Sequence, residues 1–136
     1  MTYAGDVTPS EAFAAVTQSE DAVLVDVRTR AEWTYVGVPQ VDSPRQPVLV
    51  EWQQYPDGRV NEAFIDELRA AGVSERTPLY FLCRSGVRSV AAAEAATAAG
   101  LGPAYNVLEG FEGPHDPAGH RSVAGWKVAG LPWKQG

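Results

Sequence analysis

The chain has 136 residues, of which 45% are hydrophobic, so one domain with a substantial core is expected. A formal net charge of −6 argues against binding to a nucleic-acid backbone, which clustered lysines and arginines drive. No apolar run approaches the roughly 20 residues of a membrane-spanning helix, and the first residues lack a secretory signal, so a cytoplasmic location is expected. The single cysteine, Cys83, excludes an internal disulfide and cysteine-rich metal sites.

The start of the chain carries a helix signal followed by a strand signal. Thr8-Pro9-Ser10-Glu11 combines an N-cap threonine, a proline in the first helical turn and the glutamate of a capping box. This pattern predicts a helix from about Pro9 to Gln18. The valine-rich run from Ala22 to Val27 predicts a short strand buried on both faces, with the polar residues Asp26 and Arg28 at its end.

The middle of the chain alternates between regular elements and loops. Residues 30–35 are expected to form one or two helical turns, and the prolines that follow them make a loop. Residues 48–52 predict another strand, closed by a turn at residues 55–58. A helix is predicted for residues 61–71, with Gly72 as its stop.

The remaining elements complete an alternating pattern. Residues 78–82 predict a third apolar strand that leads directly into Cys83, and the alanine-rich segment that continues to Ala99 predicts a helix. Residues 104–107 predict a last strand. This alternation indicates an α/β fold, in which a mostly parallel sheet of about five strands has helices on both faces. We expect residues 1–136 to form a single domain.

Cys83 is predicted to lie where a strand turns into a helix, which is where ligand sites form in open parallel sheets. The backbone N–H groups from Arg84 to Ser89 are expected to form an anion-binding nest, in which Gly86 permits a positive φ. The arginines of this segment add positive charge, and the same field favours thiolate over thiol. We therefore predict a nucleophile; the alternative is a buried cysteine that packs as a small hydrophobic side chain. The residues expected to bind the substrate are Arg84, Ser85, Gly86, Val87, Arg88 and Ser89.

These motifs resemble those of the rhodanese family. Cys-Arg-Ser-Gly-Val-Arg-Ser at residues 83–89, between a strand and an alanine-rich helix, is similar to the family's active-site loop. Asp-Val-Arg at residues 26–28, followed by Glu32 and Trp33, is similar to its upstream motif. Gly-Phe at residues 110–111, Gly-Trp at residues 125–126 and Gly-Leu-Pro-Trp at residues 130–133 resemble its C-terminal pattern more weakly. The resemblance covers most of the chain and implies a rhodanese-like three-layer sandwich.

The resemblance also implies an activity. Cys83 would take a sulfane sulfur from thiosulfate or a protein persulfide, and would pass it to a thiol or to cyanide through a persulfide. Asp26, Arg28 and Glu32 would support the loop and transfer no protons. No histidine is placed to act as a base, so the field of the loop and the arginines is expected to activate the thiol. No cofactor is expected.

Two segments depart from the family pattern. Residues 35–40 replace the usual Gly-His-Ile-x-Gly-Ala, so a role carried by that histidine is not transferred. Residues 113–121 look like an insertion and contain both histidines. His115, Asp116 and His120 suggest a metal site, but their spacing matches no helical histidine pair and the segment is rich in glycine and proline. We therefore predict a loop without a metal.

Two other functions stay open at this point. Cell-cycle phosphatases and arsenate reductases use a related cysteine loop, but the tyrosine-phosphatase pattern places an arginine six residues after the cysteine, where this chain has Ser89. The shorter loop is expected to admit a sulfane sulfur and to be too tight for a phosphoryl group. A regulatory module without catalysis is the other alternative, and the retained cysteine argues against it.

Overall fold

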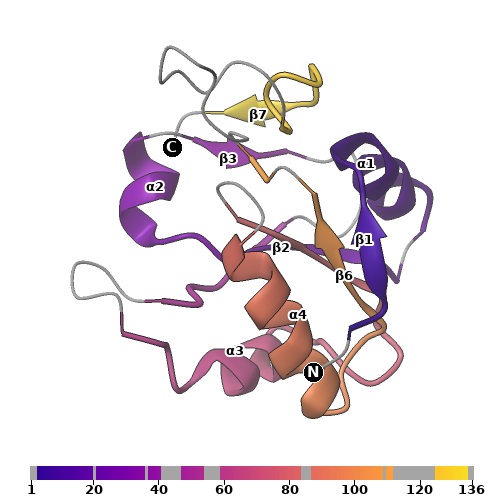
Figure 1. Ribbon diagram of the computed structural model, residues 1–136, viewed down its shortest axis with the longest axis vertical. Helices are drawn as coiled ribbons and strands as arrows, with labels where there is room; N and C mark the ends of the chain where they lie inside the picture. The colour runs from indigo at the N-terminus through magenta and orange to yellow at the C-terminus, as the bar shows by residue number, and fades with distance from the viewer. Residues whose placement is uncertain are drawn as a thin grey trace.

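A computed structural model describes residues 3–19, 21–35, 37–40, 47–53, 59–83, 87–108, 110–111 and 125–134. Five strands form one sheet in the order β1-β6-β5-β2-β4 (Figure 1). All of its pairings are parallel, which confirms the prediction of a mostly parallel five-stranded sheet. Its strands are β1 (Gly5–Val7), β2 (Val23–Asp26), β4 (Val48–Leu49), β5 (Leu79–Leu82) and β6 (Ala104–Val107).

Helices cover both faces of this sheet, so the fold has three layers. On one face, α3 and α4 contribute Phe64, Leu68 and three alanines to a buried cluster that also contains Cys83. On the other face, α1 packs against a second buried cluster that contains Trp126. The described helices are α1 (Pro9–Gln18), α2 (Arg30–Tyr35), α3 (Phe64–Ala70) and α4 (Val87–Ala98). None of them is both long and apolar enough to cross a membrane.

The helix α1 follows its local sequence signals. The Thr8 hydroxyl accepts a hydrogen bond from the Glu11 amide at 3.1 Å, and the Glu11 carboxylate accepts one from the Thr8 amide at 2.9 Å. These reciprocal bonds satisfy two N–H groups that have no partner inside the helix. The capping box therefore confirms the predicted helix start.

Two predicted elements are shorter than expected. The strand predicted for residues 48–52 ends at Leu49, and Trp52 instead packs edge-on against Phe64, with ring centroids 5.1 Å apart. The helix predicted from residue 61 begins at Phe64. Asn61 lies before it and accepts a hydrogen bond from the Ala63 amide, so a side-chain turn replaces the first helical residues.

Three strands were not predicted. The edge strand β1 contains one strongly apolar residue, Val7, and its register is set by distant β6, with Gly5 opposite Tyr105. The strands β3 (Val38–Pro39) and β7 (Trp133–Lys134) form a separate antiparallel pair. Each is too short to show a period-two pattern. The turn predicted at residues 55–58 and the insertion predicted at residues 113–121 lie outside the described residues.

Candidate active site around Cys83

Cys83 directly follows β5, and α4 begins four residues later at Val87. Its side chain is buried, with a residue exposure of 1%. Its carbonyl oxygen accepts a hydrogen bond from the Phe111 amide at 2.7 Å, which fixes the backbone at the end of the strand. The predicted strand-to-helix position is therefore present. Arg84, Ser85 and Gly86, which carry much of the predicted nest, lie outside the described residues, and Val87 is described only by its backbone.

The sulfur of Cys83 has a polar neighbour inside the core. Its Sγ lies 3.2 Å from the Ser89 hydroxyl, and that hydroxyl donates to Asn106 Oδ1 at 2.5 Å. Cys83, Ser89 and Asn106 are all buried. Ser89 was expected near the substrate, whereas Asn106 was not singled out. Its signal was a lone amide within the apolar strand β6, where a buried polar group needs a hydrogen-bond partner.

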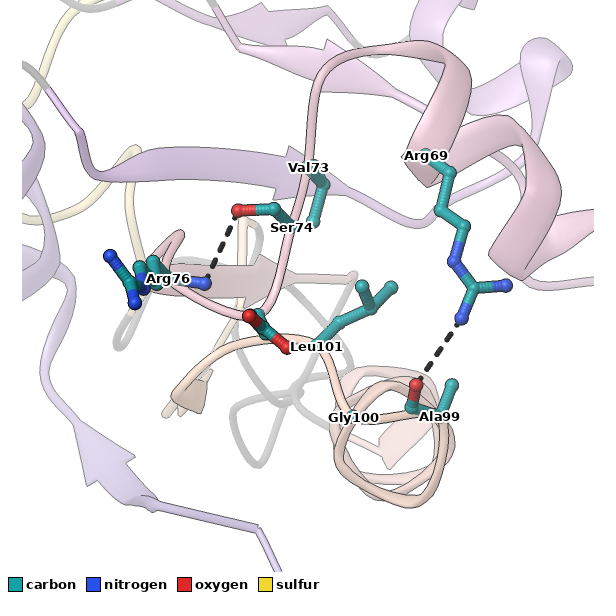
Figure 2. A pocket seen from close by; sticks show the side chains of 8 residues that line it. Arg69, Val73, Ser74, Arg76, Ala99, Gly100 and Leu101 are labelled. Carbon is teal, nitrogen blue, oxygen red and sulfur yellow. Dashed lines mark hydrogen bonds between the residues drawn. The ribbon is translucent and has the colours of Figure 1, made fainter.

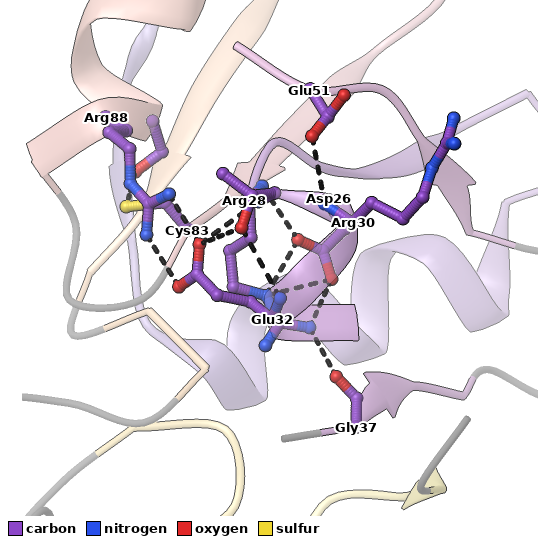
Figure 3. Close-up of polar contacts among 10 residues, drawn as sticks. Asp26, Arg28, Arg30, Glu32, Gly37, Glu51, Cys83 and Arg88 are labelled. Atoms are coloured by element: carbon purple, nitrogen blue, oxygen red, sulfur yellow. Dashed lines mark hydrogen bonds and ion pairs between the residues drawn. The ribbon is translucent and has the colours of Figure 1, made fainter. Parts of the chain in front are cut away.

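Arg88 forms a two-point ion pair with Glu32, which joins α4 to α2 (Figure 3). Its Nη1 and Nη2 atoms lie 2.7 and 2.8 Å from the two carboxylate oxygens. Burial opposes ionisation of Glu32, but hydrogen bonds from Arg88 and Thr29 outweigh it and lower the pKa of Glu32 to about 2. The hydrogen bond from Arg88 to Glu32 likewise raises the pKa of Arg88. Both groups are therefore charged at neutral pH.

This pair connects residues for which the sequence indicated separate roles. Arg88 was predicted to bind the substrate and Glu32 to support the loop, and the structure brings the two side chains together. Glu32 also accepts hydrogen bonds from the Thr29 amide and hydroxyl, both at 3.1 Å, and so holds the start of α2. Electrostatic attraction to Cys83 also contributes to the raised pKa of Arg88, and the two-point pair with Glu32 fixes the orientation of the Arg88 guanidinium.

Asp26 and Arg28 form a fully buried ion pair at the adjacent end of β2 (Figure 3). Arg28 Nη2 lies 2.6 Å from Asp26 Oδ2 and donates to the carbonyl of Gly37 at 2.7 Å. The guanidinium carbon is 4.2 Å from the centre of the Phe111 ring. Since the Phe111 amide also binds the Cys83 carbonyl, Phe111 links this pair to the backbone of Cys83. The support role of Asp26 and Arg28 stays a prediction.

A concave region lies at the end of the sheet opposite Cys83 (Figure 2). It is lined by residues that precede β5 and follow α4, among them Ser74, Arg76 and Leu101. Arg69 donates to the carbonyl of Ala99 at 3.3 Å, and the Ser74 hydroxyl accepts from the Arg76 amide at 3.2 Å. These hydrogen bonds stabilise the turns of the polypeptide at this end of the sheet.

The segment considered for a metal, with His115, Asp116 and His120, lies outside the described residues. Within the described ranges, no three side chains of the metal-binding types gather closely enough to hold an ion. The expectation of a site without a metal remains a prediction.

Comparison with known proteins identifies the class of fold first. A rhodanese-like domain protein from Staphylococcus aureus superimposes with a TM-score of 0.60 and 24% identity, over 84% of this chain and 94% of that one. The fold is therefore rhodanese-like, as predicted. The crystal structure of Rv0390 from M. tuberculosis is more similar, with a TM-score of 0.91 and 53% identity over 99% of this chain and 100% of that one.

The sequence comparisons define the family. An uncharacterised protein of Rickettsia conorii is 35% identical over 131 residues, which are 95% of this chain and 96% of that protein. A family model described as the STR4 middle domain matches residues 4–136. The chain belongs to this STR4 middle domain family.

Proposed function

We propose that this protein is a sulfurtransferase that carries a sulfane sulfur on Cys83. The observation that supports this most is the position of the Cys83 sulfur, buried between the end of β5 and the start of α4 and in contact with the Ser89 hydroxyl. A cysteine that only filled the core would share the burial, but its sulfur would not need a polar partner that is itself bound to a buried amide.

The proposed reaction has two displacement steps. The Cys83 thiolate attacks the outer sulfur of thiosulfate, a new sulfur–sulfur bond forms, and sulfite leaves with the electron pair of the broken bond. A thiol or cyanide then attacks the terminal sulfur of the persulfide, which restores the Cys83 thiolate. A protein persulfide replaces thiosulfate as donor with the same balance, because its own thiolate is the leaving group. Neither step requires a cofactor or a nucleic acid, and both suit a cytoplasmic protein.

The described side chains support this chemistry in different ways. The amino end of α4 and the Arg88 guanidinium place positive charge near the sulfur, which favours its anionic form. Glu32 fixes the orientation of the Arg88 guanidinium, and the buried Asp26–Arg28 pair fixes the adjacent loop. Cys83 packs within an apolar cluster, and such surroundings would protect a persulfide from side reactions with water.

A phosphatase function is less well supported. Phosphoryl transfer needs guanidinium and N–H donors around three equatorial oxygens. Position six of the loop is occupied by Ser89, whose hydroxyl is bound to Asn106, and the Arg88 guanidinium faces Glu32. A purely regulatory role would not require the polar contact of the Cys83 sulfur. Sulfur transfer is therefore the function that these contacts favour.

Mass spectrometry of the intact protein after exposure to thiosulfate tests this proposal. We expect Cys83 to gain one sulfur atom, and cyanide to remove it with release of thiocyanate. Cys83→Ser is the matched control and should gain nothing. The same preparations are assayed with an aryl phosphate, for which we expect negligible hydrolysis. Phosphate release that depends on Cys83 and exceeds sulfur transfer would overturn the assignment.

A further inference from the structure

A chain of hydrogen bonds connects the buried Cys83 sulfur to the protein surface. From Cys83 it passes through Ser89 to Asn106, whose Nδ2 donates to Asp6 Oδ1 at 3.0 Å. Tyr3 closes the chain by donating its hydroxyl to the same carboxylate oxygen at 2.8 Å. Asn106 lies opposite Asp6 in the β1–β6 pairing, and Asp6 is exposed to solvent. The chain therefore crosses from α4 to the edge of the sheet.

The chemistry of its groups fixes the direction of every hydrogen in this chain. The carboxylate of Asp6 accepts hydrogen bonds, so the amide NH₂ of Asn106 faces it. The Asn106 carbonyl oxygen then faces Ser89 and must accept. Because the Ser89 hydroxyl has a single hydrogen, which it donates to Asn106, only its lone pairs face Cys83. The hydrogen between sulfur and oxygen therefore belongs to Cys83.

We propose that Asp6 and Asn106 are positioning residues that hold Cys83 as a resting thiol through the direction of this hydrogen-bond chain. Thiolate formation then requires the Ser89 hydroxyl to turn its hydrogen from Asn106 to the sulfur. The inference rests on the proposed function, in which the thiolate is the reactive form. It adds that the Asp6 carboxylate, on the edge strand β1, restrains that reactivity.

Charged groups also lie near both ends of this hydrogen-bond chain. At the Cys83 end, the Arg88 guanidinium of α4 is paired with Glu32 of α2, and it interacts electrostatically with both Cys83 and Asp26 of β2. These three groups are unchanged when Asp6 is replaced, so they cancel when variants are compared. At the surface end, Tyr3 lies near both Asp6 and Glu94 of α4. Replacing Glu94 therefore serves as a control, because it removes a nearby negative charge and no member of the hydrogen-bond chain.

Replacing Asp6 with Asn should reverse the direction of the chain. The new side chain has an NH₂ group that can donate to the Asn106 oxygen, which leaves the Asn106 NH₂ group to face Ser89. The Ser89 hydroxyl is then free to donate to the sulfur, and hydrogen bonds to charged acceptors are stronger than neutral ones. We expect the thiolate fraction at neutral pH to rise about tenfold.

The experiment measures the ultraviolet absorbance of the thiolate against pH, as the difference between each protein and its Cys83→Ser counterpart. This reading needs neither a sulfur donor nor reagent access to the buried thiol, so it is independent of the persulfide test. We expect Asp6→Asn to move the midpoint about one pH unit lower. Asn106→Leu, which breaks the chain and frees the Ser89 hydroxyl, should give a similar shift, and adding Asp6→Asn to it should change little. Glu94→Gln should have a small effect.

The double variant, which combines Asp6→Asn with Asn106→Leu, distinguishes an effect relayed through the hydrogen bonds from a direct electrostatic effect of the lost charge. Removing a negative charge acts through space whether or not the chain is intact, whereas a relayed effect disappears when Asn106 is replaced. An unchanged midpoint in Asp6→Asn, or a shift of the same size in the Asn106→Leu background, would overturn the proposal. Asp6→Ala is a second surface variant with the same expectation, because Asn106 is then free to flip. Thermal melts establish that each protein is folded before titration.

Discussion

Replacement of Glu32 by Gln tests how much the ion pair with Arg88 contributes to the fold. The pKa of about 2, compared with 4.5 for an ordinary glutamate, corresponds to about 3 kcal/mol of folding free energy at neutral pH. Because both side chains keep some contact with solvent, we expect a loss of about 2 kcal/mol. For a chain of this size, such a loss lowers the melting temperature by roughly 5–8 °C.

The same pair predicts a pH dependence with a definite sign. The pKa of Glu32 is depressed in the folded state, so its stabilising contribution is complete above pH 4.5 and is lost as the pH falls toward 2. The melting temperatures of the wild-type protein and Glu32→Gln should therefore differ at pH 7 and converge between about pH 5 and pH 2.

Thermal melts by circular dichroism across this pH range provide the measurement. Glu62→Gln, which removes the same charge from an exposed position, is the matched control and should melt within about 1 °C of the wild type. If Glu32→Gln and the wild-type protein melt together at pH 7, or if their difference persists unchanged at pH 2, the ion pair does not provide the stabilisation that its geometry indicates.

Three further predictions concern the same end of the sheet. Cys83→Ser should abolish sulfur transfer and leave the urea midpoint nearly unchanged, since serine has similar size but is a much weaker nucleophile; undiminished turnover would exclude the mechanism. Asp26→Asn should lower the free energy of unfolding in urea by about 3–5 kcal/mol, because it leaves Arg28 buried without a counter-charge. Asp66→Asn, on the exposed side of α3, is the control, and an equal or larger loss of unfolding free energy in that variant would contradict the prediction. Arg88→Lys should lower kcat/KM for thiosulfate about tenfold or more, nearly as much as Arg88→Ala, because an ammonium group cannot form the two-point pair with Glu32. Full activity in Arg88→Lys would show that the positive charge alone suffices.

Elements encoded by local signals were predicted well. The capping box of α1 acts between residues three apart, and the alanine-rich sequence of α4 favours helix without tertiary contacts. The position of Cys83 at the end of an apolar strand also followed from neighbouring residues alone. Prediction was weaker where an element depends on its partner. β1 has little apolar pattern of its own and becomes a strand only by pairing with β6.

The sequence by itself determined the α/β class, the order of its main elements and the residue types at the Cys83 site. Tertiary structure alone decided which of these side chains touch. Arg88 meets Glu32 across 56 residues, and Asn106 meets Asp6 across 100. Such pairs depend on strand order and helix direction, which bring distant segments together, whereas periodicity and capping report only on neighbours within a few residues. The direction of the hydrogen bonds at Cys83 therefore became visible only after the sheet was assembled.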